Sequence, residues 1–397
     1  MSAGYASFGS CNLRHRLPWS GAAGEPCRPR ATRDDSNHPS RSHHIERRVI
    51  DLASFDNRVG HVLDNPEVSM SGRITSAFDR ASTAREVVAG RDLTGETVIV
   101  TGGASGIGVE TVRALAEGGA DVVIAARKPT LAQTVIADID TTAPGRTSFE
   151  MLDLGDLASV RQFAECWQDR PLTVLVNNAG VMACPQDYTK DGLEMQIGTN
   201  HFGHFLLATL LAPALEAGAD ASGHPSRVVS LSSIGHIRSD IRWDDPHFRQ
   251  GDYDKWIAYG QAKTANALFA VGMTQHFRDR GILANAVMPG GILTPLQRHL
   301  SIEEQRAMGW LDENDQPIAS FKNTEQGAST SVWAAVGPEL DGVGGLYLED
   351  CAQAAPWTQK SPWSGVMPHA LDAGSAERLW TLSVDTVAAR SRGTSAK

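Results

Sequence analysis

The chain has 397 residues and a formal net charge of −10, and 41% of its residues are hydrophobic and 21% charged. These proportions are ordinary for a globular protein with a sizeable core. An acidic surface repels phosphate backbones, so the charge argues against a nucleic-acid partner.

The apolar stretches and the cysteines indicate the compartment in which the protein works. The longest apolar stretch, residues 205–215, is shorter than a membrane span requires, so we expect no span. The five cysteines are scattered and form no Cys-x-x-Cys pair, which argues against a disulfide framework or a zinc cluster. This usage suits a reducing compartment, and we expect a cytoplasmic protein without a metal site.

The first 69 residues differ from the rest, because they are rich in Arg, Ser, Pro and His and lack hydrophobic periodicity. A targeting peptide would need an apolar core and few acidic residues, and this segment has neither. We therefore interpret residues 1–69 as a disordered extension, or as the result of a mis-assigned start before Met70. Residues 70–397 would then form a single domain.

From residue 93 onward, short apolar runs alternate with helical patterns. This alternation predicts an α/β fold of the Rossmann-like, doubly wound type, with a mainly parallel seven-stranded sheet and helices on both faces. The expected strands are residues 97–101, 121–125, 148–152, 173–177, 227–231, 282–287 and 345–348, and the expected helices lie near 106–118, 130–139, 157–169, 191–216 and 253–280.

Two irregular stretches, 235–252 and 291–325, are expected to be insertions or lids rather than parts of the sheet. The second is a candidate substrate loop. It contains Ile292, Leu293, Trp310 and Phe321, so a hydrophobic alcohol or ketone would suit it, although an ordinary lid would have the same composition.

A glycine-rich turn follows the first expected strand and precedes a helix, in the order Thr101-Gly102-Gly103-Ala104-Ser105-Gly106-Ile107-Gly108. Gly102 lets the chain turn off the strand, Gly106 lets the backbone approach a pyrophosphate, and Gly108 lets the helix pack closely. The helix N-terminus then offers free N–H groups to the phosphates. The turn predicts a dinucleotide site.

The end of the second strand indicates which dinucleotide is bound. NAD enzymes usually place an acidic residue there, but this chain has Arg127 and Lys128. Two cations suit the 2′-phosphate of NADP(H), which we favour over NAD(H). The alternative is that both are solvated surface cations.

Two further strand ends carry polar residues. Asp153 and Leu154 follow the third strand, where the carboxylate can accept from an adenine amino group or cap the next helix. Asn177-Asn178-Ala179-Gly180 ends the fourth strand, where the glycine suits a turn beneath the nicotinamide. We expect Asn177 to join neighbouring strands through hydrogen bonds, unless this is an ordinary turn.

Tyr259 and Lys263 stand four residues apart in a helical pattern, so one helix face presents a phenol beside an ammonium. A nearby cation lowers the pKa of a phenol and makes it a better acid/base. Ser232 and Ser233 end a strand upstream, where a hydroxyl can donate to a substrate oxygen or satisfy local backbone. Asn200 lies among apolar helix residues and therefore needs a partner.

His201 and His204 stand beside Asn200 with no third ligand in sight, so we interpret them as packing residues.

Taken together, the glycine turn, the Asn-Asn-Ala-Gly turn, the helix asparagine, the strand-end serine and Tyr-x-x-x-Lys resemble the short-chain dehydrogenase/reductase superfamily, over residues 92–351. The 26-residue gap from Ser233 to Tyr259 is similar to that of the retinol dehydrogenase-like branch.

The resemblance implies a role for each matching residue. Tyr259 would be the acid/base, Lys263 would hold the nicotinamide ribose and lower the Tyr259 pKa, and Ser233 would orient the carbonyl. Asn200 would hold a water that connects Lys263 to solvent. The remaining assignments are cofactor contacts: Asn177 and Ala179 with Gly180 under the nicotinamide, and Pro289, Gly290 and Thr294 in a turn that contacts the nicotinamide side.

The chain departs from the branch at Met288, where a histidine is common, and in the loop after Thr294. The resemblance implies an alcohol or carbonyl substrate, and a monomer or a homo-oligomer built through the long helices. The competing hypothesis is a sensor or scaffold that binds NADP(H) without turnover, because a fold alone does not determine function.

Overall fold

The computed structural model describes residues 72–167 and 170–392, so the predicted extension at 1–69 lies outside the described residues. All seven expected strands are present in one sheet, in the order β3-β2-β1-β4-β5-β6-β7-β8. Their bounds are Thr97–Thr101 (β1), Asp121–Ala126 (β2), Thr147–Met151 (β3), Val174–Asn177 (β4), Ser226–Leu231 (β5), Ile282–Met288 (β6), Tyr347–Glu349 (β7) and Ala352–Gln353 (β8).

The expected number of strands, seven, is one too low. The eighth strand, β8, has two residues and pairs antiparallel with β7, whereas the pairs from β3 to β7 are all parallel. Such a short strand has no run of alternating side chains, so hydrophobic patterning does not reveal it. Most of the other strands are detectable because both of their faces are buried, although the edge strand β3 is only partly buried.

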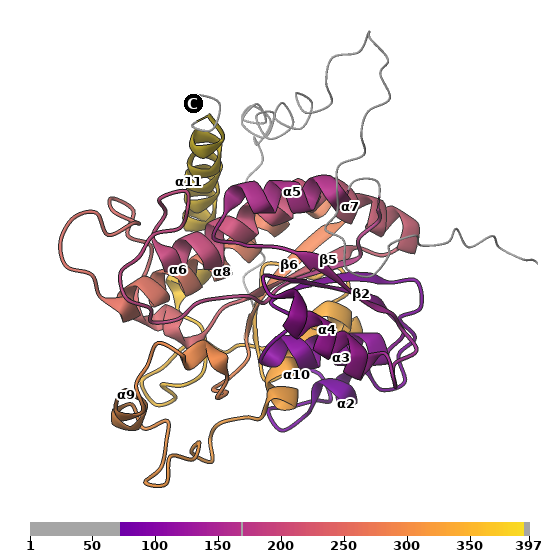
Figure 1. Ribbon diagram of the computed structural model, residues 1–397, viewed down its shortest axis with the longest axis horizontal. Helices are drawn as coiled ribbons and strands as arrows, with labels where there is room; N and C mark the ends of the chain where they lie inside the picture. Colours follow the sequence, from indigo (N-terminus) through magenta and orange to yellow (C-terminus); the bar gives the residue numbers. More distant parts are fainter. Residues whose placement is uncertain (1–71, 168–169, 393–397) are drawn as a thin grey trace, which may run out of the picture.

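Helices cover both faces of the sheet, as Figure 1 shows: α2, α3, α4 and α10 on one side and α5, α7, α8 and α11 on the other. The bounds are Ala84–Val88 (α2), Ile107–Glu117 (α3), Pro129–Ile139 (α4), Leu157–Trp167 (α5), Met195–Ile197 (α6), Gly203–Ser222 (α7), Lys255–Phe277 (α8), Ile302–Ala307 (α9), Thr324–Val336 (α10) and Ala373–Arg392 (α11).

The buried side chains separate into two large cores, one on each face of the sheet. In β1, Val98 and Val100 belong to the core beneath α3 and α10, and Ile99 belongs to the core beneath α7 and α8. This alternation follows from the two-residue period of a strand. The result is a Rossmann-like doubly wound fold, as expected.

The long helix expected at 191–216 begins later and is interrupted. A π-helical turn, Gly198–Phe202, joins α6 to α7 and contains Asn200. Such turns frequently occur at functional sites. By length and composition the helical stretch Met195–Ser222 could cross a membrane, but 67% of its apolar window is buried within the protein, as in a core helix.

The stretch 291–325 is mostly irregular, as expected, but it includes a 3₁₀ turn, Pro295–Gln297, and α9. The stretch 235–252 begins inside another 3₁₀ turn, Ile234–Arg238. Both stretches lie near the carboxyl ends of the strands, where ligands bind in open parallel sheets.

Candidate active site

A cleft of about 1390 Å³ runs along the carboxyl ends of β1 to β6. Most of the residues selected from the sequence line it, although they come from segments far apart in the chain. These residues are Gly102, Ser105, Gly106, Ile107, Arg127, Lys128, Asp153, Leu154, Ala179, Gly180, Ser233, Tyr259, Lys263, Pro289, Gly290 and Thr294. Four others, Thr101, Gly108, Asn177 and Asn200, do not line the cleft.

The glycine turn has the geometry that the sequence predicts. Gly102 and Gly106 have positive φ angles of 67° and 58°, which favour glycine. A Cβ on Gly108 would lie 2.5 Å from the Gly102 carbonyl oxygen, so only glycine lets α3 approach the turn this closely. No side chain caps α3, so its first N–H groups remain available for a ligand in the cleft.

At the other end of the cofactor region, Arg127 and Lys128 follow β2 and are exposed at the cleft. Asp153 also lines the cleft, and its carboxylate accepts a hydrogen bond from the Gly155 N–H at 3.0 Å. The interpretation of Asp153 as a helix cap is wrong, because Asp156 accepts from the first N–H groups of α5 instead.

The expectation that Asn177 joins neighbouring strands is also wrong. Its buried side-chain amide has no hydrogen-bond partner within the described part of the chain. Asn178 makes the connection, because its Nδ2 donates to the Thr101 carbonyl at 2.7 Å. The sequence motif contains two adjacent asparagines, and strand alternation alone places their side chains on opposite sides.

Asn200 and Lys263 meet around Gly180. A Cβ on Gly180 would lie 3.1 Å from Asn200 Oδ1 and 3.9 Å from Lys263 Nζ. The Asn200 amide is held in place by Val181, whose N–H donates to Oδ1 at 2.8 Å and whose carbonyl accepts from Nδ2 at 2.9 Å. Lys263 Nζ donates to the Leu231 carbonyl at 2.8 Å.

Tyr259 and Ser233 meet around Gly235. A Cβ on Gly235 would lie 2.8 Å from Tyr259 Cε1 and 3.4 Å from Ser233 Oγ. Burial raises the pKa of Tyr259 to about 12, and a hydrogen bond with Ser233 partly opposes this rise. Burial lowers the pKa of Lys263 to about 8. Both shifts describe the chain without a cofactor, so the role inferred for Lys263 stays a prediction.

His204 connects the glycine turn to the π-helical turn. Its Nδ1 lies 2.9 Å from the Asn200 carbonyl oxygen and its Nε2 lies 2.8 Å from Thr101 Oγ1. Burial lowers the pKa of His204 to about 4, so the ring is neutral at pH 7, donates through Nδ1 and accepts at Nε2. The described residues contain no group of three potential metal ligands, and both histidines of this helix have structural contacts.

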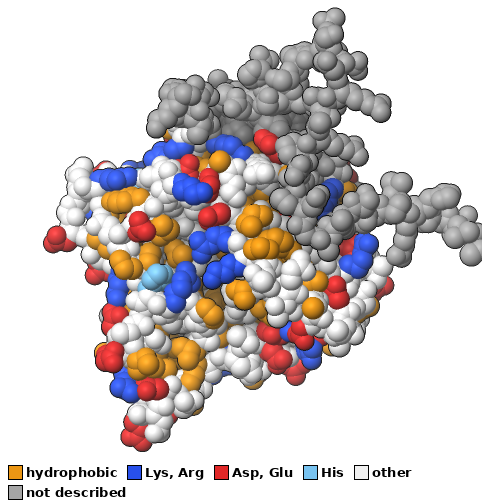
Figure 2. All heavy atoms as spheres, in the orientation of Figure 1, with side chains coloured by type: hydrophobic (Ala, Val, Ile, Leu, Met, Phe, Trp, Pro, Cys, Tyr) orange, Lys and Arg blue, Asp and Glu red, His pale blue; other side chains and the backbone are white. Residues whose placement is uncertain are grey.

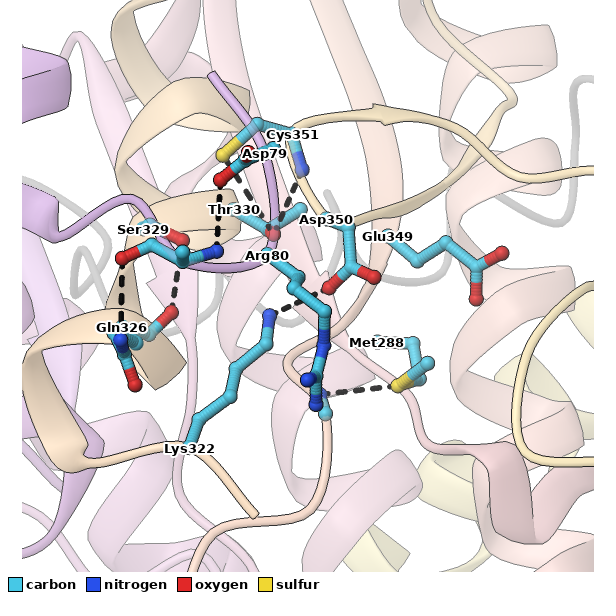
Figure 3. Close-up of polar contacts among 12 residues, drawn as sticks. Asp79, Arg80, Met288, Lys322, Gln326, Ser329, Thr330, Glu349, Asp350 and Cys351 are labelled. Atoms are coloured by element: carbon cyan, nitrogen blue, oxygen red, sulfur yellow. Dashed lines mark hydrogen bonds and ion pairs between the residues drawn. The ribbon is translucent and has the colours of Figure 1, made fainter. Parts of the chain in front are cut away.

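The part of the cleft around Gly290 includes residues that the sequence alone did not indicate. Lys322 Nζ, almost fully buried, forms an ion pair of 2.6 Å with Asp350 (Figure 3). Arg80 also lines the cleft. The Lys322 side chain packs on Gly290, whose N–H faces the Met288 sulfur at 3.0 Å. Arg80 precedes α2 and Lys322 precedes α10, and only the tertiary structure brings both of them to the cleft.

Part of the cleft lining is apolar. Of the four hydrophobic candidates in the loop, Ile292, Trp310 and Phe321 line the cleft and Leu293 does not, and Trp256 and Leu296 line it as well. Ring contacts of about 6 Å join Trp256 to Trp310 and Trp310 to Phe321. Figure 2 shows hydrophobic side chains around a group of Lys and Arg side chains near the middle of one face of the molecule.

Comparison with known proteins agrees with this site. The family model for short chain dehydrogenases matches residues 96–244. A Streptomyces lividans protein named "Probable oxidoreductase" is 47% identical over 302 residues, which cover 75% of this chain and 99% of the relative. Retinol dehydrogenase 13 of Mus musculus is 36% identical over 304 residues, covering 74% of this chain and 84% of the relative.

A solved structure of a Mycobacterium paratuberculosis protein superposes with a TM-score of 0.58 at 31% identity, covering 77% of this chain and 97% of that chain. The chain belongs to the short-chain dehydrogenase/reductase superfamily, and its relatives include the retinol dehydrogenase-like members that the motifs resembled. It is therefore an oxidoreductase by family.

Proposed function

We propose that the protein interconverts a hydrophobic alcohol and the corresponding ketone or aldehyde, with NADP(H) as the hydride carrier. The observation that carries the proposal is that Tyr259, Ser233 and Lys263 line the same cleft as the glycine turn. Three groups with acid/base, donor and cationic character thus surround the space beyond the phosphate-binding end of α3.

The residues of the cleft fit the cofactor. The open N-terminus of α3 and the positive φ of Gly106 suit a pyrophosphate, and Arg127 with Lys128 suits a 2′-phosphate. Asp153 is free to accept from an adenine amino group, since it caps no helix. When bound, NADP(H) supplies or accepts the hydride.

The side chains handle the proton. In reduction, the Tyr259 hydroxyl transfers its proton to the carbonyl oxygen that becomes the alcohol, and the Ser233 hydroxyl donates a hydrogen bond to the same oxygen. In oxidation, the Tyr259 phenolate removes the proton from the alcohol. Lys263 and Asn200, whose polar atoms both lie near Gly180, would carry the proton between Tyr259 and solvent.

The pKa values explain why the phenol needs the cofactor. In the protein alone, burial holds the pKa of Tyr259 near 12, so the phenol is protonated at neutral pH. A cation beside the ring favours the phenolate, and an oxidised nicotinamide is such a cation. Alcohol oxidation should therefore depend on pH only after the oxidised cofactor has bound, whereas carbonyl reduction starts with the protonated form already present.

The substrate proposal rests on the apolar part of the cleft lining. Trp256, Trp310 and Phe321 offer aromatic surface next to Tyr259, and aromatic walls favour a substrate with an extended apolar part. The relative named retinol dehydrogenase 13 has an apolar alcohol in its name, which supports this class.

The test combines a substrate panel with the Tyr259→Phe variant. The wild-type protein should oxidise or reduce at least one hydrophobic substrate, with NADPH preferred over NADH. Tyr259→Phe should reduce turnover by about 10²–10⁴-fold and leave NADPH binding, followed by nicotinamide fluorescence, unchanged. NADPH binding without hydride exchange on any substrate would favour the sensor hypothesis, and full turnover in Tyr259→Phe would exclude the proposed acid/base.

A further inference from the structure

Arg298 lines the same cleft as Arg127 and Lys128. Arg127 follows β2 at the adenosine end of the cleft, and Arg298 lies on the substrate loop, directly after the turn Pro295–Gln297. Both side chains line the cleft, although 171 positions separate them in the sequence. They belong to different walls, one to the sheet and the other to the loop.

The backbone before Arg298 is fixed on the phosphate-binding turn. A Cβ on Gly106 would lie 3.4 Å from Thr294, so the loop passes directly over the start of α3. Thr294 and Gln297 form a capping box, and Gln297 Nε2 also donates to the Ile292 carbonyl at 2.8 Å. These bonds set the direction in which the next residue, Arg298, leaves the turn.

Neither guanidinium has a carboxylate partner within the described ranges 72–167 and 170–392. The ion pairs of this part of the chain include neither Arg127 nor Arg298. Arg298 instead folds back and donates to the Pro295 carbonyl at 3.1 Å. Burial lowers the Arg298 pKa, and the positive charge of Arg127 lowers it further, which agrees with the placement of both side chains along one cleft.

We propose that Arg298 is a cofactor-specificity residue that binds the 2′-phosphate of NADP(H) from the loop side, opposite Arg127. This inference rests on the proposed NADP(H) preference and deepens it. A dianionic phosphate between two guanidinium groups replaces their repulsion with charge-assisted hydrogen bonds, which are the strong ones in proteins. NADH lacks this phosphate and therefore gains nothing from the second guanidinium.

The proposal also connects the choice of cofactor with the apolar residues of the substrate loop. Leu296 lines the cleft two residues before Arg298, and Trp310 lies further along the same loop. A contact between Arg298 and the cofactor would hold this segment of the loop in place while the substrate binds. The loop would thus respond to a feature of the cofactor that is remote from the nicotinamide.

The experiment measures the dissociation constants of NADPH and NADH by nicotinamide fluorescence for the wild-type protein, Arg298→Gln, Arg127→Gln and the double variant. A competition series with 2′,5′-ADP and 5′-AMP isolates the contribution of the 2′-phosphate. Arg306→Gln is the matched control, because Arg306 lies on the same loop, does not line the cleft and pairs with Asp315.

Arg298→Gln should weaken NADPH and 2′,5′-ADP by about 10-fold and leave NADH and 5′-AMP unchanged. Because both arginines would hold one phosphate, their effects on NADPH affinity should not be independent. The fold-loss of affinity in the double variant should therefore differ from the product of the two single fold-losses. Arg306→Gln should match the wild-type protein for every ligand.

Failure of this inference differs from failure of the proposed cofactor. If Arg127→Gln abolishes an NADPH preference that Arg298→Gln retains, Arg298 has no part in phosphate binding while the proposed function stands. If the wild-type protein binds NADH as tightly as NADPH, the cofactor assignment itself is wrong. A rise in substrate KM in Arg298→Gln with unchanged cofactor binding would assign Arg298 to the substrate instead.

Discussion

Gly235 lies against both Tyr259 and Ser233, so adding a single methyl group there should disturb catalysis without unfolding the protein. Gly235 has a backbone conformation that other residues adopt, so only space requires glycine at this position. The alanine Cβ would lie 2.8 Å from Tyr259 Cε1 and 2.9 Å from Cδ1. Because carbon atoms pack at about 3.5–4.0 Å, the ring or the turn must shift by about 0.7 Å.

A displacement of this size at a reacting group should lower kcat of Gly235→Ala by about 10–100-fold, since a misplacement of about 1 Å can cost about 10²-fold. NADPH binding should persist, because the glycine turn is elsewhere in the cleft. Steady-state kinetics and cofactor titration measure both quantities. Gly374→Ala is the matched control, with its nearest neighbouring atom at 3.5 Å. Wild-type turnover in Gly235→Ala would refute this account of the Tyr259 position.

Three further outcomes follow from the same cleft. Lys263→Met should abolish turnover yet raise the free energy of unfolding at pH 7, by on the order of 3 kcal/mol, because burial lowers the Lys263 pKa from 10.5 to about 8. Between these two pKa values the folded state binds fewer protons than the unfolded state, so the stability advantage of Lys263→Met over the wild-type protein should shrink as pH rises from 8 to 10.5 in urea titrations. A difference in the free energy of unfolding that stays constant with pH would contradict this. Gly180→Ala should press on Asn200 Oδ1 and lower kcat more than cofactor affinity, and equal loss of both would contradict the contact. Asn177→Leu should raise Tm, since an unpaired buried amide costs about 1–3 kcal/mol; a lower Tm would indicate a polar partner for the amide.

Much of the fold was predictable because the parallel strands other than the edge strand β3 are buried on both faces. Their apolar runs stand out from the sequence, and the motifs lie at their carboxyl ends. The helix α10 was not predicted for a related reason: nearly all of its residues are buried, including Ser329, Thr330 and Ser331. A helix without a polar face produces no amphipathic pattern to detect.

The candidate site was predictable where a motif is local and not where a contact is long-range. Tyr259 and Lys263 share one helix, so their spacing alone indicates one face. Arg80, Arg298 and Lys322 carry no local signal, because any solvated arginine or lysine looks the same in sequence. Asn177 was misjudged for a further reason: the sequence cannot say which of two adjacent asparagines faces the neighbouring strand.

The site also depends on residues that contribute no side chain. The missing Cβ at Gly180 leaves room beside Asn200 Oδ1 and Lys263 Nζ, and the missing Cβ at Gly235 leaves room beside the Tyr259 ring and Ser233 Oγ. Neither position has a positive φ angle, so backbone strain does not explain either glycine. Both follow the carboxyl end of a strand, where a Cβ would project into the reacting groups. The catalytic distances are therefore set partly by these two glycines, and substituting them tests the geometry without removing any functional group.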